Sequence, residues 1–328
     1  MSRELVLASF AAATESHLIT EPRSVRFARF KASFDATAEL RRLSARGYRF
    51  VARSDGAFPP LLGAIHDPPP GLFLRGAGAE ALLSRQAVAI VGARACSPYG
   101  RQVARRLGRE LAAAGLVVVS GLARGVDGEA HRGALEAGGL TVAVLGCGID
   151  RDYPAAHRQL AREISDAGLI VSEYAPGVEP APWRFPARNR IVAGLCAATL
   201  VVEARERSGA LITADLALEE GREVFAVPGE ITSALSVGSN ALLRLGATPC
   251  TDAADVLESY GIVPAEERLP ELGDRASAVL ERVCEAAATA DELARTTELG
   301  AGELAAVLTE LELAGAVTVE EGIVRASR

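Results

Sequence analysis

The segment from Ser120 to Asp127, Ser-Gly-Leu-Ala-Arg-Gly-Val-Asp, carries residue types suited to binding an anion. Its small residues let the backbone approach an anion closely, and the helix expected after it would add free N–H groups and the positive end of its dipole. The spacing fits neither the G-x-G-x-x-G pattern of dinucleotide sites nor the G-x-x-x-x-G-K-[ST] pattern of nucleotide triphosphatases. A tight strand-to-helix turn with Asp127 as N-cap is the alternative. The pattern predicts a phosphate-binding loop made of Ser120, Gly121, Leu122, Ala123, Arg124, Gly125 and Asp127.

Arginines cluster at two further places. Gly92 and Arg94 end an apolar run, from which Arg94 could reach a phosphate held by the neighbouring loop. The stretch 183–190, Trp-Arg-Phe-Pro-Ala-Arg-Asn-Arg, holds three arginines, two aromatic residues and an asparagine. Arginines neutralise a nucleic-acid backbone, whereas aromatic rings and guanidinium planes stack on unpaired bases. A turn whose Trp183 and Phe185 cap the core is the alternative. The contact predicted from this stretch involves Phe185, Arg188, Asn189 and Arg190.

A third loop, 203–214, is expected to complete the anion-binding rim with Ser208, Gly209 and Thr213. Glu173 and Glu203 also stand at strand ends, but nothing in the sequence around them indicates activation for acid–base chemistry. His131 and His157 lie in or near helical segments and are more typical of helix surfaces than of catalysts. No Ser/His/Asp or Cys/His set can be drawn, so no catalytic residue is predicted.

The remaining composition argues against several classes of protein. Five cysteines lie far apart, without a C-x-x-C pair or a histidine at ligand spacing, so neither structural zinc nor a disulfide framework is predicted. No run approaches the roughly 18 consecutive apolar residues of a membrane span. The first residues lack the basic region and long apolar core of a secretory signal. We therefore expect a cytoplasmic protein with no membrane contact and no bound metal.

Six short β-branched runs alternate with helical patterns in the middle of the chain. They cover residues 87–94, 116–123, 141–148, 169–174, 198–204 and 223–230. The runs are apolar throughout, as in strands covered on both faces, so they predict an α/β fold with a parallel sheet and flanking helices. Ligands of such open sheets bind beyond the carboxyl ends of the strands, which is where the three loops would lie.

The net charge of −7 is distributed unevenly along the chain. Residues 1–78 carry +4, residues 79–262 carry −3 and residues 263–328 carry −8. A phosphate-binding surface must therefore come from local arginine clusters in the first two segments. Proline-rich stretches at 66–76 and 261–275 predict boundaries. The expected parts are a short N-terminal helical or extended segment at 1–75, a sheet domain at 76–262 and a third domain at 275–328.

Several loops occur together in an order and spacing that resemble one family. They are FPPLLGAIHDPPPGLFLRG (58–76), VGAR (91–94), SGLARGVDGEAH (120–131), GCGIDRDYPAAH (146–157), FPARNRIVAG (185–194), SGALITA (208–214) and VPGE (227–230). This set resembles the DNA-processing protein A family (DprA, also called Smf), over about residues 58–250.

The resemblance implies an extended Rossmann-like domain that binds single-stranded DNA and loads the RecA recombinase onto it in natural transformation. It also implies a homodimer without enzymatic activity, and no cofactor is expected. Carried over by position, Arg94 and the loop 120–125 would hold backbone phosphates, and Arg188 and Arg190 would line the same pocket. The alternative is a nucleotide-binding hydrolase of the lysine-decarboxylase-like (LOG) type. Its P-G-G-x-G-T signature is missing from the corresponding region, 208–220.

The C-terminal residues 275–328 are predicted to form three helices and a short hairpin, resembling the winged-helix domain that some family members append. A winged helix that reads DNA needs basic residues on its third helix and wing. Those positions instead carry Glu303, Glu310, Glu312, Glu320 and Glu321. We predict that this domain binds no DNA on its own and serves protein contacts or regulation.

Overall fold

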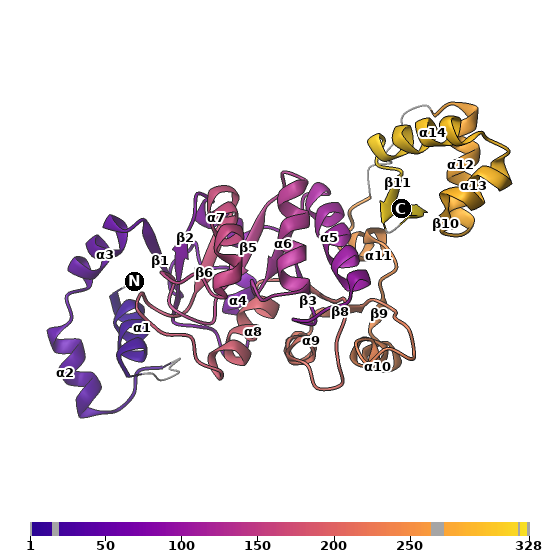
Figure 1. Cartoon of the computed structure of the whole chain (residues 1–328). Coiled ribbons are helices and arrows are strands. Elements are labelled where there is room, and N and C mark those ends of the chain that lie inside the picture. The colour runs from indigo at the N-terminus through magenta and orange to yellow at the C-terminus, as the bar shows by residue number, and fades with distance from the viewer. Residues whose placement is uncertain (1, 15–19, 264–271, 321, 327–328) are drawn as a thin grey trace. The chain divides into compact units, whose positions relative to one another are not determined.

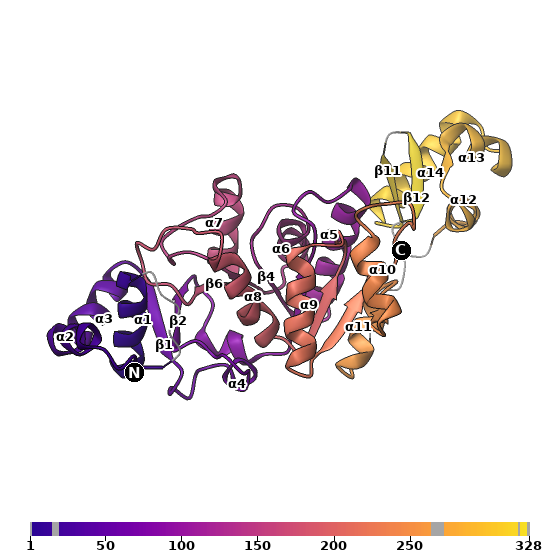
Figure 2. The same ribbon diagram turned by 90° about the horizontal axis from the view of Figure 1, so that it is seen from below.

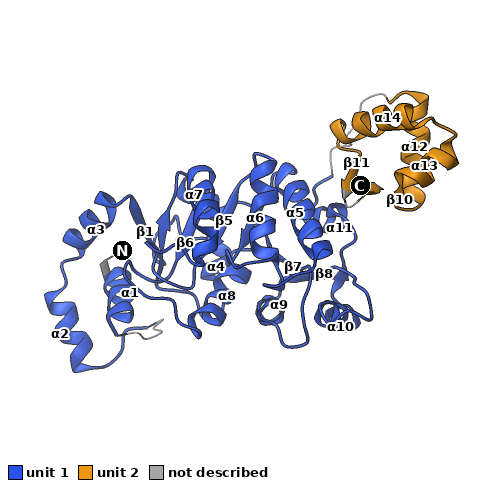
Figure 3. Ribbon diagram, viewed as in Figure 1, with its two compact units in different colours: residues 1–264 blue, residues 265–328 orange. Residues whose placement is uncertain are grey.

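The computed structural model describes residues 2–14, 20–263, 272–320 and 322–326. Within these ranges the chain forms two compact units, one covering residues 1–264 and the other residues 265–328 (Figure 3). The boundary predicted at 261–275 lies mostly outside the described residues. No helix in the described ranges is long and apolar enough to cross a membrane.

The described part of the first unit contains a nine-stranded sheet with the order β1-β2-β6-β5-β4-β3-β7-β8-β9. Its strands are β1 (Tyr48–Ala52), β2 (Gly71–Arg75), β3 (Ala87–Val91), β4 (Val117–Ser120), β5 (Thr141–Val144), β6 (Leu169–Ser172), β7 (Ala198–Val201), β8 (Glu223–Ala226) and β9 (Thr248–Pro249). Strands β3 to β9 are parallel, whereas β1 and β2 pair antiparallel. The predicted parallel α/β sheet is confirmed, and each of the six predicted runs contains one strand.

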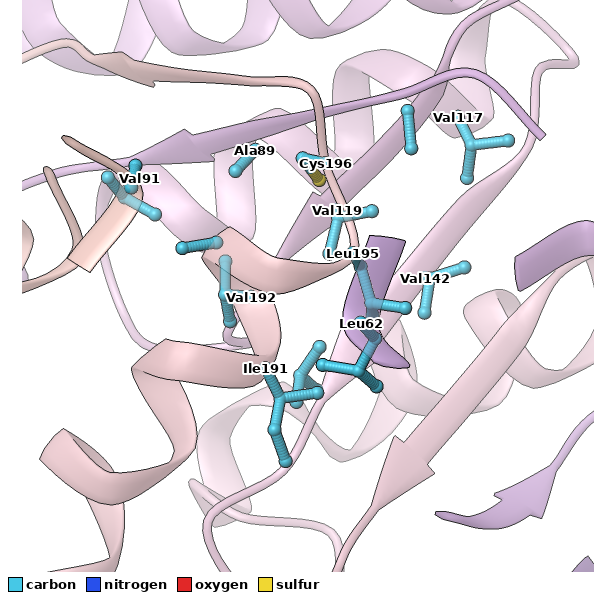
Figure 4. Close-up of a cluster of buried hydrophobic side chains, with 14 of the residues drawn as sticks. Leu62, Ala89, Val91, Val117, Val119, Val142, Ile191, Val192, Leu195 and Cys196 are labelled. Carbon is cyan, nitrogen blue, oxygen red and sulfur yellow. The ribbon is translucent and has the colours of Figure 1, made fainter. Parts of the chain in front are cut away.

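Helices bury both faces of this sheet, because the strands are apolar at successive positions. Ala89 of β3 belongs to one hydrophobic cluster and its neighbour Val88 to another. Figure 4 shows the first cluster, in which Ile191 comes from α8 and Val119 from the sheet. The helices on this face are α4 (Pro60–Gly63), α8 (Arg184–Gly194), α9 (Gly209–Glu219) and α10 (Val237–Arg244) (Figure 2). Those on the opposite face are α5 (Pro98–Ala113), α6 (Val126–Glu136), α7 (Arg158–Ala167) and α11 (Ala253–Ser259) (Figure 1).

The strand order reverses beside β3. The chain adds β4, β5 and β6 on one side of β3, and then β7, β8 and β9 on the other. Loops at such a reversal leave in opposite directions and open a crevice at the carboxyl edge of the sheet. The loops after β3, β4 and β7 therefore meet at one place.

The N-terminal residues join this sheet and do not form a separate segment. Strands β1 and β2 extend it beyond β6, with Phe73 opposite Ser172. Leu5 and Leu43, from two N-terminal helices, share a hydrophobic cluster with Phe50 and Phe73 of these strands. The N-terminal helices are α1 (Ser2–Thr14), α2 (Val25–Ser33) and α3 (Ala36–Ala45). Residues 1–75, expected as a segment of their own, thus lie in the same compact unit as the parallel strands.

The second unit has three helices and a small sheet in its described residues. The helices are α12 (Asp274–Glu285), α13 (Ala290–Thr297) and α14 (Ala301–Leu313). The strands are β10 (Ala288–Thr289), β11 (Val317–Glu320) and β12 (Ile323–Ala326), in the order β10-β12-β11. The predicted three helices and hairpin are confirmed. Glu303, Glu310 and Glu312 are exposed on α14, while the predicted wing residue Glu321 lies outside the described ranges.

Candidate functional site

A pocket of about 330 Å³ opens where the strand order reverses, between the loops after β3, β4 and β7 and the first turns of α8 and α9. The predicted residues that line it are Gly92, Arg94, Gly121, Ala123, Asp127, Phe185, Arg188, Asn189, Ser208, Gly209 and Thr213. Further lining residues are Val91, Ala93, Ala95, Pro186, Val192, Arg205, Arg207 and Ala210. Three loops far apart in sequence thus contribute to one cavity.

Asp127 shapes the loop after β4 from inside. Its carboxylate accepts hydrogen bonds from the N–H groups of Gly121 (3.2 Å) and Ala123 (3.3 Å). The N-cap of α6 is Gly125, at a φ of 77° that favours glycine, and not Asp127. Burial raises the pKa of Asp127, while the Arg188 charge and the two N–H groups oppose that rise. Because Asp127 already occupies these N–H groups, much of the attraction for an anion must come from the surrounding side chains.

Arg188 of α8 is a buried cation in the wall of this pocket, only 4% exposed. Its Nη1 donates to the carbonyl oxygens of Gly121 (2.7 Å) and Val144. Burial lowers the pKa of Arg188, Asp127 opposes that effect, and the nearby charge of Arg94 adds to it. Two guanidinium groups that repel each other across one pocket create a site whose electrostatic energy falls when an anion binds between them.

Arg94 is an exposed cation of the pocket lining that lies beside a pair of aromatic rings. Its guanidinium carbon lies 5.4 Å from the centre of the Phe185 ring. Phe185 stacks on Tyr153, with ring centres 5.3 Å apart and ring planes inclined by 25°. Tyr153 is 42% exposed and was not among the predicted site residues. The sequence offered one indication of its role: Tyr153 is an aromatic residue in the loop after β5, near the carboxyl edge of the sheet.

The N-terminus of α9 forms another wall. Ser208 caps this helix by accepting a hydrogen bond from the Ala210 N–H (3.3 Å). The amide of Asn189 donates to the Gly209 carbonyl (3.0 Å), which also accepts from the Thr213 hydroxyl (3.2 Å). These bonds place the positive end of the α9 dipole at the pocket, where it favours negative charge.

Two exposed arginines complete the lining. Arg205 and Arg207 follow β7 in the stretch Arg-Glu-Arg (205–207), whose alternating charge resembles an ordinary solvated loop. Their position between a strand end and the α9 N-terminus was the signal for a site role. Together with Arg94 and Arg188 they outnumber Asp127, the carboxylate of the lining, so the pocket favours anions.

Other predicted residues serve the structure around the pocket instead of lining it. Ser120 donates from its hydroxyl to the Ile90 carbonyl (2.6 Å) and so ties β4 to β3. Leu122 is fully buried in the core at a φ of 59°. Arg124 is exposed. The predicted residues outside the pocket lining are Ser120, Leu122, Arg124, Gly125 and Arg190.

Arg190 forms a buried ion pair with Glu173 and does not line the pocket. Its Nη1 and Nη2 lie 2.8 and 2.7 Å from the two carboxylate oxygens of Glu173. It also donates to the Asp67 carbonyl (2.9 Å). Burial opposes ionisation of Arg190, but Glu173 and Asp67 outweigh it and raise the pKa of the guanidinium. Residues two positions apart on a helix face different directions, which separates Arg190 from Arg188.

The other candidates for acid–base chemistry also have structural partners. Glu203 accepts hydrogen bonds from the N–H (2.9 Å) and the hydroxyl of Ser97. The expectation that His131 and His157 lie on helix surfaces is wrong, because both are buried. Burial lowers the pKa of His131 to about 3, and His157 donates to a backbone carbonyl (3.0 Å). Within the described ranges, no three His, Cys, Asp or Glu side chains converge as metal ligands would.

A Rossmann-like sheet with an arginine-lined pocket at its reversal point defines an α/β protein suited to a phosphate-bearing ligand. Within this class, residues 49–261 match the family described as DNA recombination-mediator protein A. Residues 263–322 match the DprA winged helix domain. The chain belongs to the DNA recombination-mediator protein A family, and the resemblance seen in its loops is confirmed.

Three relatives show the extent of the similarity. The putative DNA processing protein DprA of Mycobacterium tuberculosis is 40% identical over 310 residues, which cover 88% of this chain and 79% of that protein. The X-ray structure of DprA from Streptococcus pneumoniae has a TM-score of 0.67 at 38% identity, covering 79% of this chain and 93% of that one. DprA from Helicobacter pylori, described as having a unique single-stranded DNA binding mode, has a TM-score of 0.59 at 32% identity, covering 65% and 95%.

Proposed function

We propose that this chain binds single-stranded DNA by holding backbone phosphates in the pocket at the reversal point. The observation that carries the proposal is that Arg94 and Arg188 face one pocket, with the Arg188 charge buried. Charge-assisted contacts to phosphate are strong where solvent is excluded. Family membership and the single-stranded DNA binding described for the Helicobacter pylori relative support this proposal.

Contacts of this kind read the backbone and not the bases. Phosphate contacts carry no sequence information, and stacking on Phe185 or Tyr153 tolerates any base, so we expect little sequence preference. In a duplex the base faces are stacked on one another and cannot stack on these rings, so a single strand should bind more tightly.

On the same basis we infer that the chain loads the RecA recombinase onto the bound strand in DNA uptake and natural transformation. It would act as a homodimer in the cytoplasm, without catalysis or a cofactor. Bases that do not stack on an aromatic ring of the site keep their faces free for a recombinase, which is the requirement of a loader. The test is the rate at which RecA covers oligothymidine, which the chain should raise.

The nucleotide-hydrolase alternative finds no specific support in the pocket. Asp127, the carboxylate of the lining, is bound to two loop N–H groups and is not free to act as a base. Release of nucleobase from nucleoside monophosphates would test this alternative, and we expect none. For the second unit we keep the proposal of protein contacts or regulation, since its exposed Glu303, Glu310 and Glu312 would repel phosphates.

The variant Arg94→Ala is expected to weaken oligothymidine binding about 10-fold at low salt, because it removes one exposed phosphate contact. The slope of log K against log salt concentration should fall by about 0.7, the value for one phosphate of a single strand. Fluorescence anisotropy across a salt series measures both quantities. Arg109→Ala is the control, because this exposed arginine of α5 is outside the pocket. An unchanged slope for Arg94→Ala would remove this residue from the site.

A pair of glycines tests the geometry of the pocket. A Cβ on Gly121 would lie 2.4 Å from Arg188 Nη2, whereas a Cβ on Gly56, an exposed residue outside the pocket, would meet nothing within 4 Å. Gly121→Ala must therefore displace the guanidinium, and we expect at least a 10-fold loss of oligothymidine affinity. Gly56→Ala should change the affinity less than about threefold, within the range of a surface substitution. Equal effects of the two variants would contradict the placement of Arg188.

A further inference from the structure

Trp183 is an exposed aromatic residue beside the pocket with no role in the site described so far. It precedes α8, two positions before Phe185, and is absent from the pocket lining. It is the only tryptophan in the sequence, and 43% of it is exposed. Trp183 therefore presents a large aromatic surface to solvent on the same turn of the chain as Phe185.

Arg184 and Tyr174 hold this ring in place. The Arg184 guanidinium carbon lies 4.8 Å from the Trp183 ring centre and 5.3 Å from the Tyr174 ring centre. The two rings are 6.4 Å apart and nearly perpendicular, at 88°. Arg184 is 3% exposed and donates to the Glu179 carbonyl, so it is fixed in turn. A ring held by a buried partner loses little entropy when a ligand stacks on it.

A groove of about 620 Å³ runs past this stack, between α1 to α3 and the loop after β6. Arg184 lines one side of it, and Phe34 and Arg42 line the other. Its carboxylates already have partners: Asp35 caps α3, Glu39 pairs with Arg42 (2.5 Å), and Glu179 pairs with Arg151 (2.5 Å). Further exposed arginines on α2 and α3 are Arg26, Arg29 and Arg41. These three arginines are outside the lining of the groove, so they place positive charge on α2 and α3 beyond it, where it is complementary to a polyanion.

We propose that Trp183 is a second base-stacking platform for single-stranded DNA. A base of the strand leaving the phosphate pocket stacks on the exposed Trp183 ring, and the strand continues past the groove toward the exposed arginines Arg26, Arg29 and Arg41 of α2 and α3. This inference rests on the proposed function and extends it from a phosphate pocket to a path across the start of α8. Stacking on tryptophan is open to any unpaired base, so the platform adds affinity for a single strand without sequence preference.

The fluorescence of Trp183 provides a direct test, since no other tryptophan contributes to the emission. The full chain is titrated with oligothymidine and with an abasic oligomer of equal length, while anisotropy of a labelled strand records binding independently. Oligothymidine should quench the tryptophan emission at saturation by more than half, and the abasic oligomer should not. Quenching that follows the binding curve for both oligomers would mean that no base stacks on the ring, and would overturn the proposal.

Two variants separate stacking from structure. Trp183→Ala should raise the Kd for oligothymidine about 5- to 100-fold, while the salt slope stays the same because no phosphate contact is lost. Trp183→Phe, which keeps a ring, should recover most of the affinity at an unchanged thermal unfolding midpoint. Normal binding by Trp183→Ala overturns the platform and leaves the proposed function intact. Failure of the unmodified chain to bind oligothymidine even at low salt contradicts the proposed function itself.

Discussion

Replacing Arg188 with glutamine is expected to abolish measurable oligothymidine binding, with a loss of at least about 100-fold. Arg188 is the buried cation of the pocket, and truncating a buried, hydrogen-bonded charge costs roughly 2–5 kcal/mol of binding energy. The loss exceeds that expected for Arg94→Ala, since solvent screens the exposed Arg94. Anisotropy of a labelled oligothymidine at low salt measures the effect.

The same substitution should also lower stability. Glutamine leaves the carbonyls of Gly121 and Val144 without their charged donor, and it removes the charge that opposes the raised pKa of Asp127. Buried acceptors left unpaired cost about 1–3 kcal/mol each, so denaturant unfolding should show a loss of roughly 2–6 kcal/mol for the two carbonyls.

Two matched variants separate binding from folding. Arg188→Lys keeps the charge but not the planar fork, so it should recover stability only in part and bind weakly. Arg124→Ala, an exposed arginine of the neighbouring loop outside the pocket, should change affinity less than about threefold. Binding by folded Arg188→Gln at the affinity of the unmodified chain would show that phosphates are held elsewhere.

The parallel part of the fold could be predicted because buried parallel strands are continuous apolar runs, and each predicted run between 87 and 230 contains one strand. The pocket followed from the same reasoning, since parallel strands end at one edge and bring their loops together. The edge strands β1 and β2 could not be placed in this way. Their position depends on antiparallel pairing of β2 with β6, about a hundred residues away, for which no local pattern exists.

Within the site, residue types were easier to predict than the direction of side chains. Arg188 and Arg190 look equivalent in the motif F-P-x-R-N-R, but only the packing of α8 determines which faces the pocket and which meets Glu173. Asp127 has the residue type of a helix cap and instead supports the loop. His131 is buried because α6 packs on the sheet. Its polar residue type within a helical pattern does not indicate this burial. The sequence therefore does not show how each helix is rotated about its own axis, and that rotation determines which side chains face the pocket.

Glu173→Gln is expected to lower the stability of the fold while leaving DNA affinity nearly unchanged. The pocket variants, in contrast, are expected to lower DNA affinity. Glu173 and Arg190 are 6% and 8% exposed and share two short hydrogen bonds. Removing one partner of a buried ion pair costs roughly 3–5 kcal/mol where nothing compensates the remaining charge. Asp67 Oδ2 lies 3.2 Å from Arg190 Nε and still compensates part of it, so we expect the lower end, about 3 kcal/mol. For a unit of this size, that loss lowers the unfolding midpoint by roughly 6 to 12 °C.

DNA affinity measured well below that midpoint should stay within about threefold of the unmodified chain, because Arg190 lies outside the pocket. The control is Glu136→Gln, which breaks an ion pair of the same type between α5 and α6. Arg105 and Glu136 are 49% and 40% exposed, so the control should cost no more than about 1 kcal/mol. Calorimetry measures the unfolding midpoint and fluorescence anisotropy measures the DNA affinity, both on the same samples. If Glu173→Gln kept its midpoint but lost DNA affinity, Arg190 would belong to the phosphate site as its motif suggests, and the ion pair would not be its main role.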